Sequence, residues 1–321
     1  MYNQVKRDKM YISHLEKVLL NKYGIVVTAI EPAKRGFYGE TWKVSTVDAR
    51  YFVKIVYAPA HKPTYENSFF VLDYLKEQGI TFISEIVRTR SGQLSTTHDS
   101  AVLGVFKWVD GENIENDFTK ILEYKMLGKI YTVPTAPISK KLKKDCFSTK
   151  SAKDFYKYWE LLKKRTSDAA SARVSKVLEE RHDLLMHRRK RLAIFSSLCE
   201  KDLSDFYITH GDAGGNVITN GTSLWMVDWD DPRLSAPERD AWFCMDIPSA
   251  MEAFNSALQE NQIAYTLRKE RLAYYCYHSF FYYLNENLEA FFELSIENMD
   301  EKIVEYFDGW VEKKLLYADT L

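Results

Sequence analysis

His210-Gly211-Asp212-Ala213-Gly214-Gly215-Asn216, with Asp228-Trp229-Asp230 twelve residues after it, is the part of this chain that says most about its architecture. Apolar residues flank both segments at 206–209, 217–219 and 224–227, in the short runs typical of strands. The polar side chains are therefore expected at strand ends, where a rigid scaffold can orient them.

Phosphoryl transfer from a nucleoside triphosphate needs such a set of side chains. One carboxylate accepts the proton of the attacking hydroxyl, while an amide oxygen and a second carboxylate hold the Mg²⁺ that neutralises the phosphates. The alternative interpretation is that these residues occupy ordinary turns, because Gly211, the pair Gly214-Gly215 and Asn220-Gly221 are all turn formers.

Residues 1–108 predict a small lobe built around strands. A helix at 10–23 is expected to stop at Gly24. Five strands follow it, at 25–30, 42–47, 51–57, 83–89 and 101–105.

A glycine-bearing turn separates the first two of these strands. It contains Gly36, Phe37 and Gly39. A strand–turn–strand of this kind can lay backbone N–H groups over phosphates. Two glycines are also compatible with a plain hairpin, so the turn alone does not choose between the two.

Lys54 lies inside the otherwise apolar strand at 51–57. A buried lysine is costly unless its charge is paired, and Glu66, at the start of a helix expected at 66–77, is a candidate partner. Kinases use such a lysine–glutamate pair to orient the α- and β-phosphates. The alternative is a lysine on an edge strand that points into water.

Periodicity changes at Phe106-Lys107-Trp108-Val109-Asp110-Gly111-Glu112, from strand-rich before it to helical after it. We place the lobe boundary there, which gives an N-terminal nucleotide-binding lobe at 1–108 and a helical C-terminal lobe at 109–321. The connector can offer its backbone to an adenine edge. Aromatic residues crowd 274–283, where core packing is the default explanation.

Composition restricts the class of protein. The chain has 321 residues, 46% of them hydrophobic, with 44 Lys and Arg against 45 Asp and Glu. No apolar run approaches membrane-spanning length, and the first nine residues contain no apolar segment of the kind a signal peptide requires. Four scattered cysteines form no metal or disulfide spacing. The basic surplus at 140–191 falls on helical periodicity, which favours a solvated helix face over nucleic-acid binding. A cytoplasmic protein is expected.

Together these motifs resemble the aminoglycoside phosphotransferase family, within the protein-kinase-like superfamily. The resemblance spans nearly the whole chain in order, and the run 228–240, which ends Glu238-Arg239-Asp240, looks most like the spectinomycin phosphotransferase branch. It implies a bilobal α+β fold, with a small antiparallel-sheet N-lobe that carries one main helix and a larger, mostly helical C-lobe.

The resemblance also implies a role for each motif. Asp212 would be the catalytic base, with Asn216 beside it, and Asn216 and Asp228 would bind Mg²⁺. His210 and Asp240 would be structural supports of the catalytic loop.

Further residues are assigned to the nucleotide and the acceptor by the same resemblance. Lys54, held by Glu66, would grip the phosphates of ATP or GTP, and Lys107 and Val109 would meet the adenine through their backbone. The complete nucleotide set is Gly36, Phe37, Gly39, Lys54, Glu66, Lys107 and Val109. The acceptor candidates are Asp230, Asp231, Glu238 and Tyr274.

One spacing departs from the protein-kinase pattern. Three residues separate Asp212 from Asn216, whereas four separate the corresponding residues of protein kinases. Paired glycines tolerate backbone angles that other residues cannot adopt, so the shortened loop is expected to deliver Asn216 to the metal.

The leading hypothesis is an ATP- and Mg²⁺-dependent phosphotransferase that phosphorylates a hydroxyl of a small polar molecule of the aminoglycoside or aminocyclitol type, with antibiotic resistance as one biological role this would imply. Choline, homoserine, a sugar or a nucleoside are alternative acceptors. A non-catalytic kinase-like protein, similar to spore-coat members of the superfamily, is the alternative from another class. We expect a monomer or weak homodimer, without nucleic-acid or membrane partners.

Overall fold

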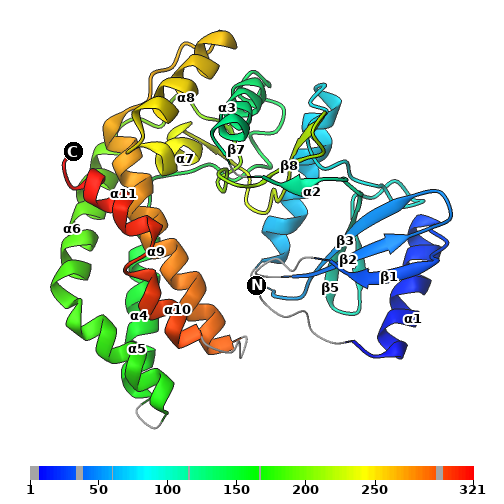
Figure 1. The fold of residues 1–321 in the computed structure, drawn as a ribbon, viewed down its shortest axis with the longest axis horizontal. Helices are drawn as coiled ribbons and strands as arrows, with labels where there is room; N and C mark the ends of the chain where they lie inside the picture. The colour runs from blue at the N-terminus through cyan, green and yellow to red at the C-terminus, as the bar shows by residue number, and fades with distance from the viewer. Residues whose placement is uncertain (1–6, 34–38, 60, 115, 166–167, 294–298) are drawn as a thin grey trace. The chain divides into compact units, whose positions relative to one another are not determined.

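The computed structural model describes residues 7–33, 39–59, 61–114, 116–165, 168–293 and 299–321 (Figure 1). Gly36 and Phe37 of the predicted phosphate-binding turn lie outside them. The chain forms two compact units: unit 1 comprises 1–143 and 208–234, and unit 2 comprises 144–207 and 235–321. The lobe boundary expected near residue 108 is not a joint between these units and stays a prediction.

Unit 1 is built on a five-stranded antiparallel sheet in the order β1-β2-β3-β5-β4. The strands are β1 (Ala29–Pro32), β2 (Glu40–Ser45), β3 (Arg50–Val56), β4 (Thr96–His98) and β5 (Ala101–Lys107). The antiparallel sheet was predicted, but two of the expected strands differ from the structure, and β4 was not expected. The strand expected at 25–30 begins at Ala29, and 83–89 contributes only isolated bridges at Ile83 and Ile86.

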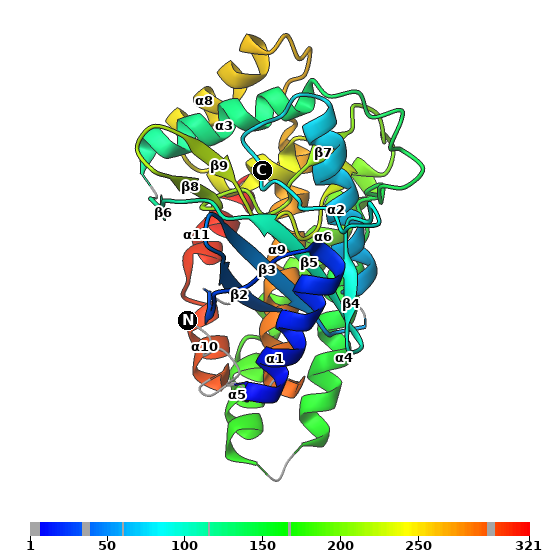
Figure 2. The same ribbon diagram turned by 90° about the vertical axis from the view of Figure 1, so that its right-hand side faces the viewer.

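The two faces of this sheet carry different residues, because side chains alternate along a strand. Val53 and Ile55 on β3 belong to a buried core with Leu15 and Leu19 of the first helix. That helix, α1 (Lys9–Val18), continues as a π-helical turn to Tyr23 and ends at Gly24, whose φ is +75°. In Figure 2, α1 lies in front of the sheet. Lys54, between the two core residues, must therefore point to the opposite face.

Helix α2 (Lys62–Glu77) covers that opposite face. It begins four residues earlier than expected, with a proline in its first turn, a position that proline favours. Phe69 of α2 packs over Gly104 of β5, where a Cβ atom would lie 2.1 Å from the ring. Glycine at this position lets the helix approach the sheet closely.

The rest of unit 1 holds a helix and a small second sheet. Helix α3 (Asp117–Tyr131) starts with a capping box in which Asn116 and Thr119 bond each other's backbone. The second sheet has the order β6-β8-β9, formed by β6 (Glu112–Asn113), β8 (Val217–Thr219) and β9 (Leu224–Met226). β7 (Tyr207–Thr209) pairs separately with β10 (Arg233–Ser235). The strands expected around the polar segments are thus present.

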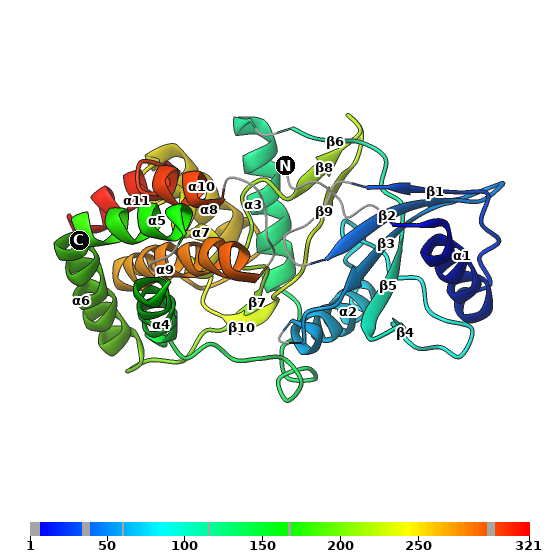
Figure 3. The same cartoon turned by 90° about the horizontal axis from the view of Figure 1, so that it is seen from below.

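Unit 2 is helical, and its long helix α9 (Lys269–Glu293) packs against α4, α6, α10 and α11 (Figure 3). The aromatic residues at 274–283 are mostly core, with Tyr277 and Phe281 fully buried and Tyr282 partly exposed. The remaining helices are α4 (Lys150–Lys164), α5 (Ala169–Glu180), α6 (His182–Cys199), α7 (Glu238–Ala241), α8 (Pro248–Glu260), α10 (Met299–Tyr306) and α11 (Trp310–Ala318), with a 3₁₀ turn at Trp242–Cys244.

Among the residues described, no helix combines the length and the apolar character that crossing a membrane requires.

Candidate active site

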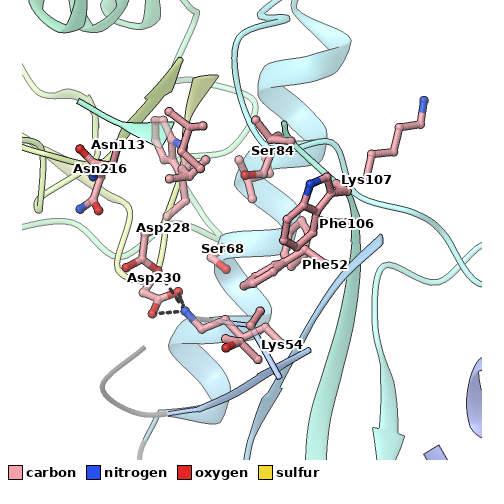
Figure 4. Close-up of a pocket in the computed structure, with 18 of the residues that line it drawn as sticks. Phe52, Lys54, Ser68, Ser84, Phe106, Lys107, Asn113, Asn216, Asp228 and Asp230 are labelled. Carbon is pink, nitrogen blue, oxygen red and sulfur yellow. Dashed lines mark hydrogen bonds and ion pairs between the residues drawn. The ribbon is translucent and has the colours of Figure 1, made fainter. Parts of the chain in front are cut away.

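A pocket of about 400 Å³ lies within unit 1. It is lined by β2, β3, α2, the end of β5 and the connector after it, and by the two polar segments that flank β8 and β9. Phe52 and Phe106 contribute apolar surface, while Lys54, Asp228 and Asp230 contribute charge (Figure 4). Apolar walls with a few convergent polar groups are typical of small-molecule sites.

Lys54 and the Asp228-Trp229-Asp230 segment meet in this pocket although 174 positions separate Lys54 from Asp228 in the chain. The Lys54 ammonium lies 3.0 Å from Asp228 Oδ1 and 2.5 Å from an oxygen of Asp230. The lysine side chain is 6% exposed, and the two aspartates are each nearly half exposed. The cation is therefore held between two carboxylates that also reach solvent.

These charges change one another's protonation. Burial disfavours the ammonium, but Asp228 and Asp230 outweigh it and raise the pKa of Lys54. The nearby ammonium lowers the pKa of Asp228, whereas loss of hydration inside the pocket and the negative charge of Asp228 raise the pKa of Asp230. Of the two carboxylates, Asp228 is thus the stronger candidate for a permanently charged cation ligand.

The expected Lys54–Glu66 pair is not formed, and that part of the prediction is wrong. Consecutive helix residues differ by about 100° in direction. Tyr65 faces the sheet, donating its hydroxyl to Lys54 O at 3.3 Å and placing its ring 5.6 Å from the ammonium, so Glu66 is turned outward and exposed. The nucleotide-binding role given to Glu66 has no support in this arrangement.

His210 links the segment that holds Asp212 to the segment that holds Asp228. Its Nε2 lies 2.8 Å from Val227 O, which can only accept a hydrogen bond, so Nε2 carries the hydrogen. Its Nδ1 then accepts a hydrogen bond from the Asp212 N–H at 3.3 Å. The ring also makes an edge contact with Trp229, at 4.6 Å between centroids. These contacts fit the supporting role predicted for His210.

The shortened loop brings Asn216 back beside Asp212. The Asn216 amide nitrogen donates to Asp212 O at 2.7 Å and lies 3.3 Å from the Asp212 carboxylate. Gly214 and Gly215 make this return possible, with φ of +120° and +111°, values that side chains strongly disfavour. Asn216 lines the pocket with Asp228, while Asp212 is exposed next to it.

Two further residues hold this loop, and the sequence analysis missed both. Glu123 of α3, which is 2% exposed, accepts the Gly214 N–H at 2.6 Å. Asn113 of β6 lines the pocket and donates to Gly215 O. A glutamate within the apolar pattern of α3 was the available signal for Glu123. The β6–β8 pairing that places Asn113 has no local signature.

The connector after β5 presents backbone groups to the pocket. The Trp108 N–H donates to Arg50 O at the start of β3. The backbone groups of successive strand residues point to opposite sides of the strand, so the carbonyl of the preceding residue, Lys107, points away from β3. Within the described part of the chain, nothing hydrogen-bonds the Val109 N–H. Both residues line the pocket, whereas the Lys107 side chain is exposed and pairs with Glu85.

Gly39 is the one described glycine of the predicted phosphate-binding turn. A Cβ atom there would lie 2.9 Å from Ile55 O, closer than non-bonded atoms tolerate. Any larger residue would push the start of β2 off β3. Its direct contact with a phosphate remains a prediction.

The acceptor residues expected next to the metal-binding segment have other partners. Asp230 pairs with Lys54, as described above. Asp231 pairs with Arg233 at 2.5 Å. Both carboxylates are therefore already in ion pairs within the protein.

The remaining predicted residues belong to unit 2, where all three are buried. Glu238 accepts the Tyr265 hydroxyl at 2.8 Å and the Arg268 N–H at 2.6 Å. Tyr274 donates to Ser148 O at 2.9 Å. Asp240 is fully buried on α7. Glu238 and Tyr274 form hydrogen bonds within the protein, so this arrangement gives no support to the acceptor-binding role predicted for them.

Comparison with known proteins adds an independent line of information. A model of the phosphotransferase enzyme family matches residues 29–275. The structure of a spectinomycin phosphotransferase in complex with ADP and spectinomycin aligns with a TM-score of 0.79 and 18% identity, over 96% of this chain and 98% of that one.

Two small-molecule kinases align at lower scores. A choline kinase from Streptococcus pneumoniae gives a TM-score of 0.60 and 16% identity, over 96% of this chain and all of that one (100%). An amicoumacin kinase in complex with AMP-PNP and Ca²⁺ gives 0.60 and 13%, over 96% and 94%. These likenesses confirm the predicted α+β, kinase-like fold class.

Proposed function

Since this chain belongs to the phosphotransferase enzyme family, and is thus a phosphotransferase with an alcohol group as acceptor, we propose that it moves the γ-phosphoryl group of magnesium-bound ATP or GTP to a hydroxyl of a small polar molecule. The observation that carries this proposal is the convergence of Lys54, Asp228 and Asn216 on one pocket. Asp212 lies directly beside Asn216. The set contains each group that such a transfer needs.

The donor atoms in the pocket fit a hard cation. The Asn216 amide nitrogen is committed to Asp212, which leaves its oxygen as the outward-facing ligand atom. Asp228 supplies a carboxylate whose pKa is lowered by Lys54. Oxygen-only ligation by an amide and a carboxylate is what Mg²⁺ prefers. When bound, Mg²⁺ would neutralise charge on the phosphate oxygens.

Each side chain then has a distinct task. The Lys54 ammonium, already fixed at the pocket, would bind phosphate oxygens. The Asp212 carboxylate would take the proton of the acceptor hydroxyl. At the same time, the hydroxyl oxygen would form a bond to the γ-phosphorus, and the bond from the γ-phosphorus to the β–γ bridging oxygen would break. His210 and the Gly214-Gly215 turn would keep Asp212 and Asn216 in register, because the reaction depends on positioning.

The base of the nucleotide would lie against the connector. The Lys107 carbonyl and the Val109 N–H form an acceptor–donor pair of the kind an adenine edge requires, and Phe52 and Phe106 supply apolar walls. Complexes of two similar proteins contain ADP and AMP-PNP. We propose ATP as the first nucleotide to test and GTP as the second.

The acceptor is proposed at the level of chemical class. Similar proteins are named a spectinomycin phosphotransferase, an amicoumacin kinase and a choline kinase. The three compounds in these names each carry a hydroxyl group and nitrogen. An aminocyclitol or aminoglycoside is our leading candidate. A choline-like amino alcohol is the next.

A screen for ADP release tests the function directly. The purified protein, ATP and Mg²⁺ would be combined with spectinomycin, aminoglycosides, choline, homoserine, sugars and nucleosides. With the responsive acceptor, Asp212→Asn is expected to lower kcat by about 10²–10⁴-fold, the range for loss of a positioned base. Asp228→Asn should raise the Mg²⁺ concentration needed for activity.

Asp48→Asn is the matched control, because Asp48 is an exposed aspartate in the β2–β3 turn of the same unit. Its activity should equal that of the unmodified protein. Each variant would first be checked for an unchanged melting temperature. A folded Asp212→Asn protein with full activity, or no ADP release with any acceptor despite nucleotide binding, would refute the proposed function.

A further inference from the structure

Three side chains of types that can ligate a metal ion lie close together in unit 1, on the α1 side of the sheet. They are His14 of α1, His98 at the end of β4 and Asp99 in the turn before β5, and one ligand atom from each lies within 4.8 Å of the other two. His14 Nδ1 is 3.3 Å from Asp99 Oδ1, and His98 Nε2 is 3.9 Å from Asp99 Oδ2. None of the three lines the nucleotide pocket.

His98 provides a second, independent observation. Its side chain is fully buried, and neither ring nitrogen has a hydrogen-bond partner among the described residues. Buried polar atoms nearly always have partners, and an unsatisfied one costs free energy. The ring is fixed by an edge contact with Tyr11, at 4.9 Å, and lies 4.8 Å from the His14 ring. A buried, fixed and unpartnered imidazole therefore faces two exposed ligand groups.

We propose that His14, His98 and Asp99 bind one first-row divalent transition-metal ion, of which Zn²⁺ is the leading candidate, with water completing the coordination. Two imidazoles and a carboxylate are a common ligand set for such ions. The alkaline-earth cations prefer oxygen-only sites, so this site would differ in selectivity from the pocket at Asp228.

The present geometry is close to what coordination needs. Ligand atoms about 2.0–2.1 Å from a tetrahedral metal lie roughly 3.3 Å apart, which the His14–Asp99 pair already satisfies. His14 and Asp99 have side chains about half exposed, at 51% and 54%, so both can adjust while His98 stays fixed. Their exposure also gives the ion a path from solvent.

The position of the site suggests a structural task. An ion there would link α1 to the edge strand of the sheet, in addition to the apolar contacts that hold the helix against the sheet. Tyr11, which touches His98, also donates its hydroxyl to Glu40 at 2.9 Å, at the start of β2. The ion would thus stabilise the layer that supports the nucleotide pocket without taking part in phosphoryl transfer.

The test is a metal titration of the chelator-treated full chain. Co²⁺ would be added in the presence of excess Mg²⁺, which occupies oxygen-only sites. Nitrogen-containing four-coordinate sites give Co²⁺ intense visible absorption, whereas oxygen-rich six-coordinate sites give weak bands. We expect an intense band that saturates at one equivalent, disappears when Zn²⁺ is added, and accompanies a rise in melting temperature.

Variants distinguish the site from adventitious binding. His14→Ala and Asp99→Asn alter exposed side chains, so both should fold and should weaken Co²⁺ binding at least about tenfold, the range for damage to a metal site. His98→Ala should abolish the band. His182→Ala is the matched control, because His182 is another exposed histidine beside an aspartate, 3.2 Å from Asp183, and it should bind as the parent protein does.

Two results would overturn the proposal. One is the absence of an intense band at one equivalent of Co²⁺ in the parent protein. The other is a band that persists in both folded variants, His14→Ala and Asp99→Asn. His98 would then be a buried neutral histidine that only packs against Tyr11.

Discussion

Lys54 shows how one residue can satisfy an apolar strand and a polar site together. Its neighbours Val53 and Ile55 face the core, so the alternation of the strand sends the lysine to the other face. A buried cation without a partner would be very costly. Asp228 and Asp230 offset that cost by flanking the ammonium. In the proposed reaction, the phosphates of the nucleotide would bind the same ammonium within the pocket.

Because Lys54 pairs with Asp228 and Asp230, substitutions of Lys54 and of Glu66 should have different effects on activity. Lys54→Met keeps an unbranched side chain close to the length of the lysine stem but removes the charge, so kcat/KM for the nucleotide should fall by about 10²–10³-fold, the range for loss of one preorganised stabilising group. Glu66→Gln should stay within about twofold, because Glu66 is exposed and does not touch Lys54. Steady-state kinetics with varied ATP would measure both.

Equal losses in the two variants would contradict this prediction. That outcome would mean that Glu66 turns toward Lys54 when nucleotide binds. Unchanged melting temperatures would be required of both proteins before the comparison, since loss of Lys54 leaves two carboxylates facing each other.

At the level of elements, the loop between β7 and β8 depends on its paired glycines. Gly214 and Gly215 have positive φ, and the Gly214 N–H donates a hydrogen bond to the Glu123 carboxylate. Gly214→Ala should therefore displace the loop, and with it Asn216 and Asp212. We expect kcat to fall at least about tenfold, because displacements of about 1 Å at a reacting centre cost up to 10²-fold.

Gly221→Ala is the control for backbone strain. Gly221 also has a positive φ, of +89°, but lies in the exposed β8–β9 turn with no atom within 4 Å of a Cβ. Both substitutions should lower the free energy of unfolding by a similar amount, on the order of 1 kcal/mol. Only Gly214→Ala should lower kcat, and a loss of kcat in both would assign the effect to strain alone.

Local signals explain which elements the sequence could predict. The helix at 10–23 was bounded by Gly24, and β8 and β9 by turn-forming residues, so these predictions were correct. The segment 83–89 has the composition of a strand, but it makes only two isolated bridges, one from Ile86 to β5 and one from Ile83 to β9. Which extended segment becomes a full strand is decided by pairing, and pairing depends on residues far away in the chain.

The same reasoning applies to the candidate site. Lys54, Asp228 and Asn216 could be predicted to share a site because the chemistry requires them together. The direction of Glu66 could not, since it depends on which helix face packs on the sheet, and Tyr65 occupies that face. Glu123 was missed for a related reason: its partner is a backbone N–H 91 positions away, and a backbone group has no signature in sequence.

At the scale of the whole molecule, the candidate nucleotide pocket is assembled within one compact unit from two distant parts of the chain. Residues 1–143 supply the sheet and α2, and residues 208–234 supply the two polar segments at 210–216 and 228–230. The helices of unit 2 are inserted between them and follow them. Residues of unit 2 therefore contribute to the free energy of unfolding of the protein without lining the pocket.

Glu238 is one such residue, and it makes the stability of the protein depend on pH. Burial raises the pKa of Glu238 to about 7, from an ordinary value of 4.5, although Arg268 and Tyr265 donate to it. Between pH 4.5 and 7 the folded protein keeps a proton that the unfolded chain has released. The free energy of unfolding therefore falls as pH rises through this window, by roughly 3 kcal/mol at most, given 1.36 kcal/mol per pKa unit.

Glu238→Gln removes the titrating group and keeps the shape of the side chain, so its unfolding free energy should change less between pH 5 and pH 8 than that of the parent protein. Urea unfolding followed by circular dichroism at several pH values measures the difference. Glu180→Gln, at a side chain 57% exposed on α5, should retain the parent pH dependence. If Glu238→Gln retains it as well, the fall in stability must originate elsewhere, and Glu238 would be ionised in the folded protein throughout this range.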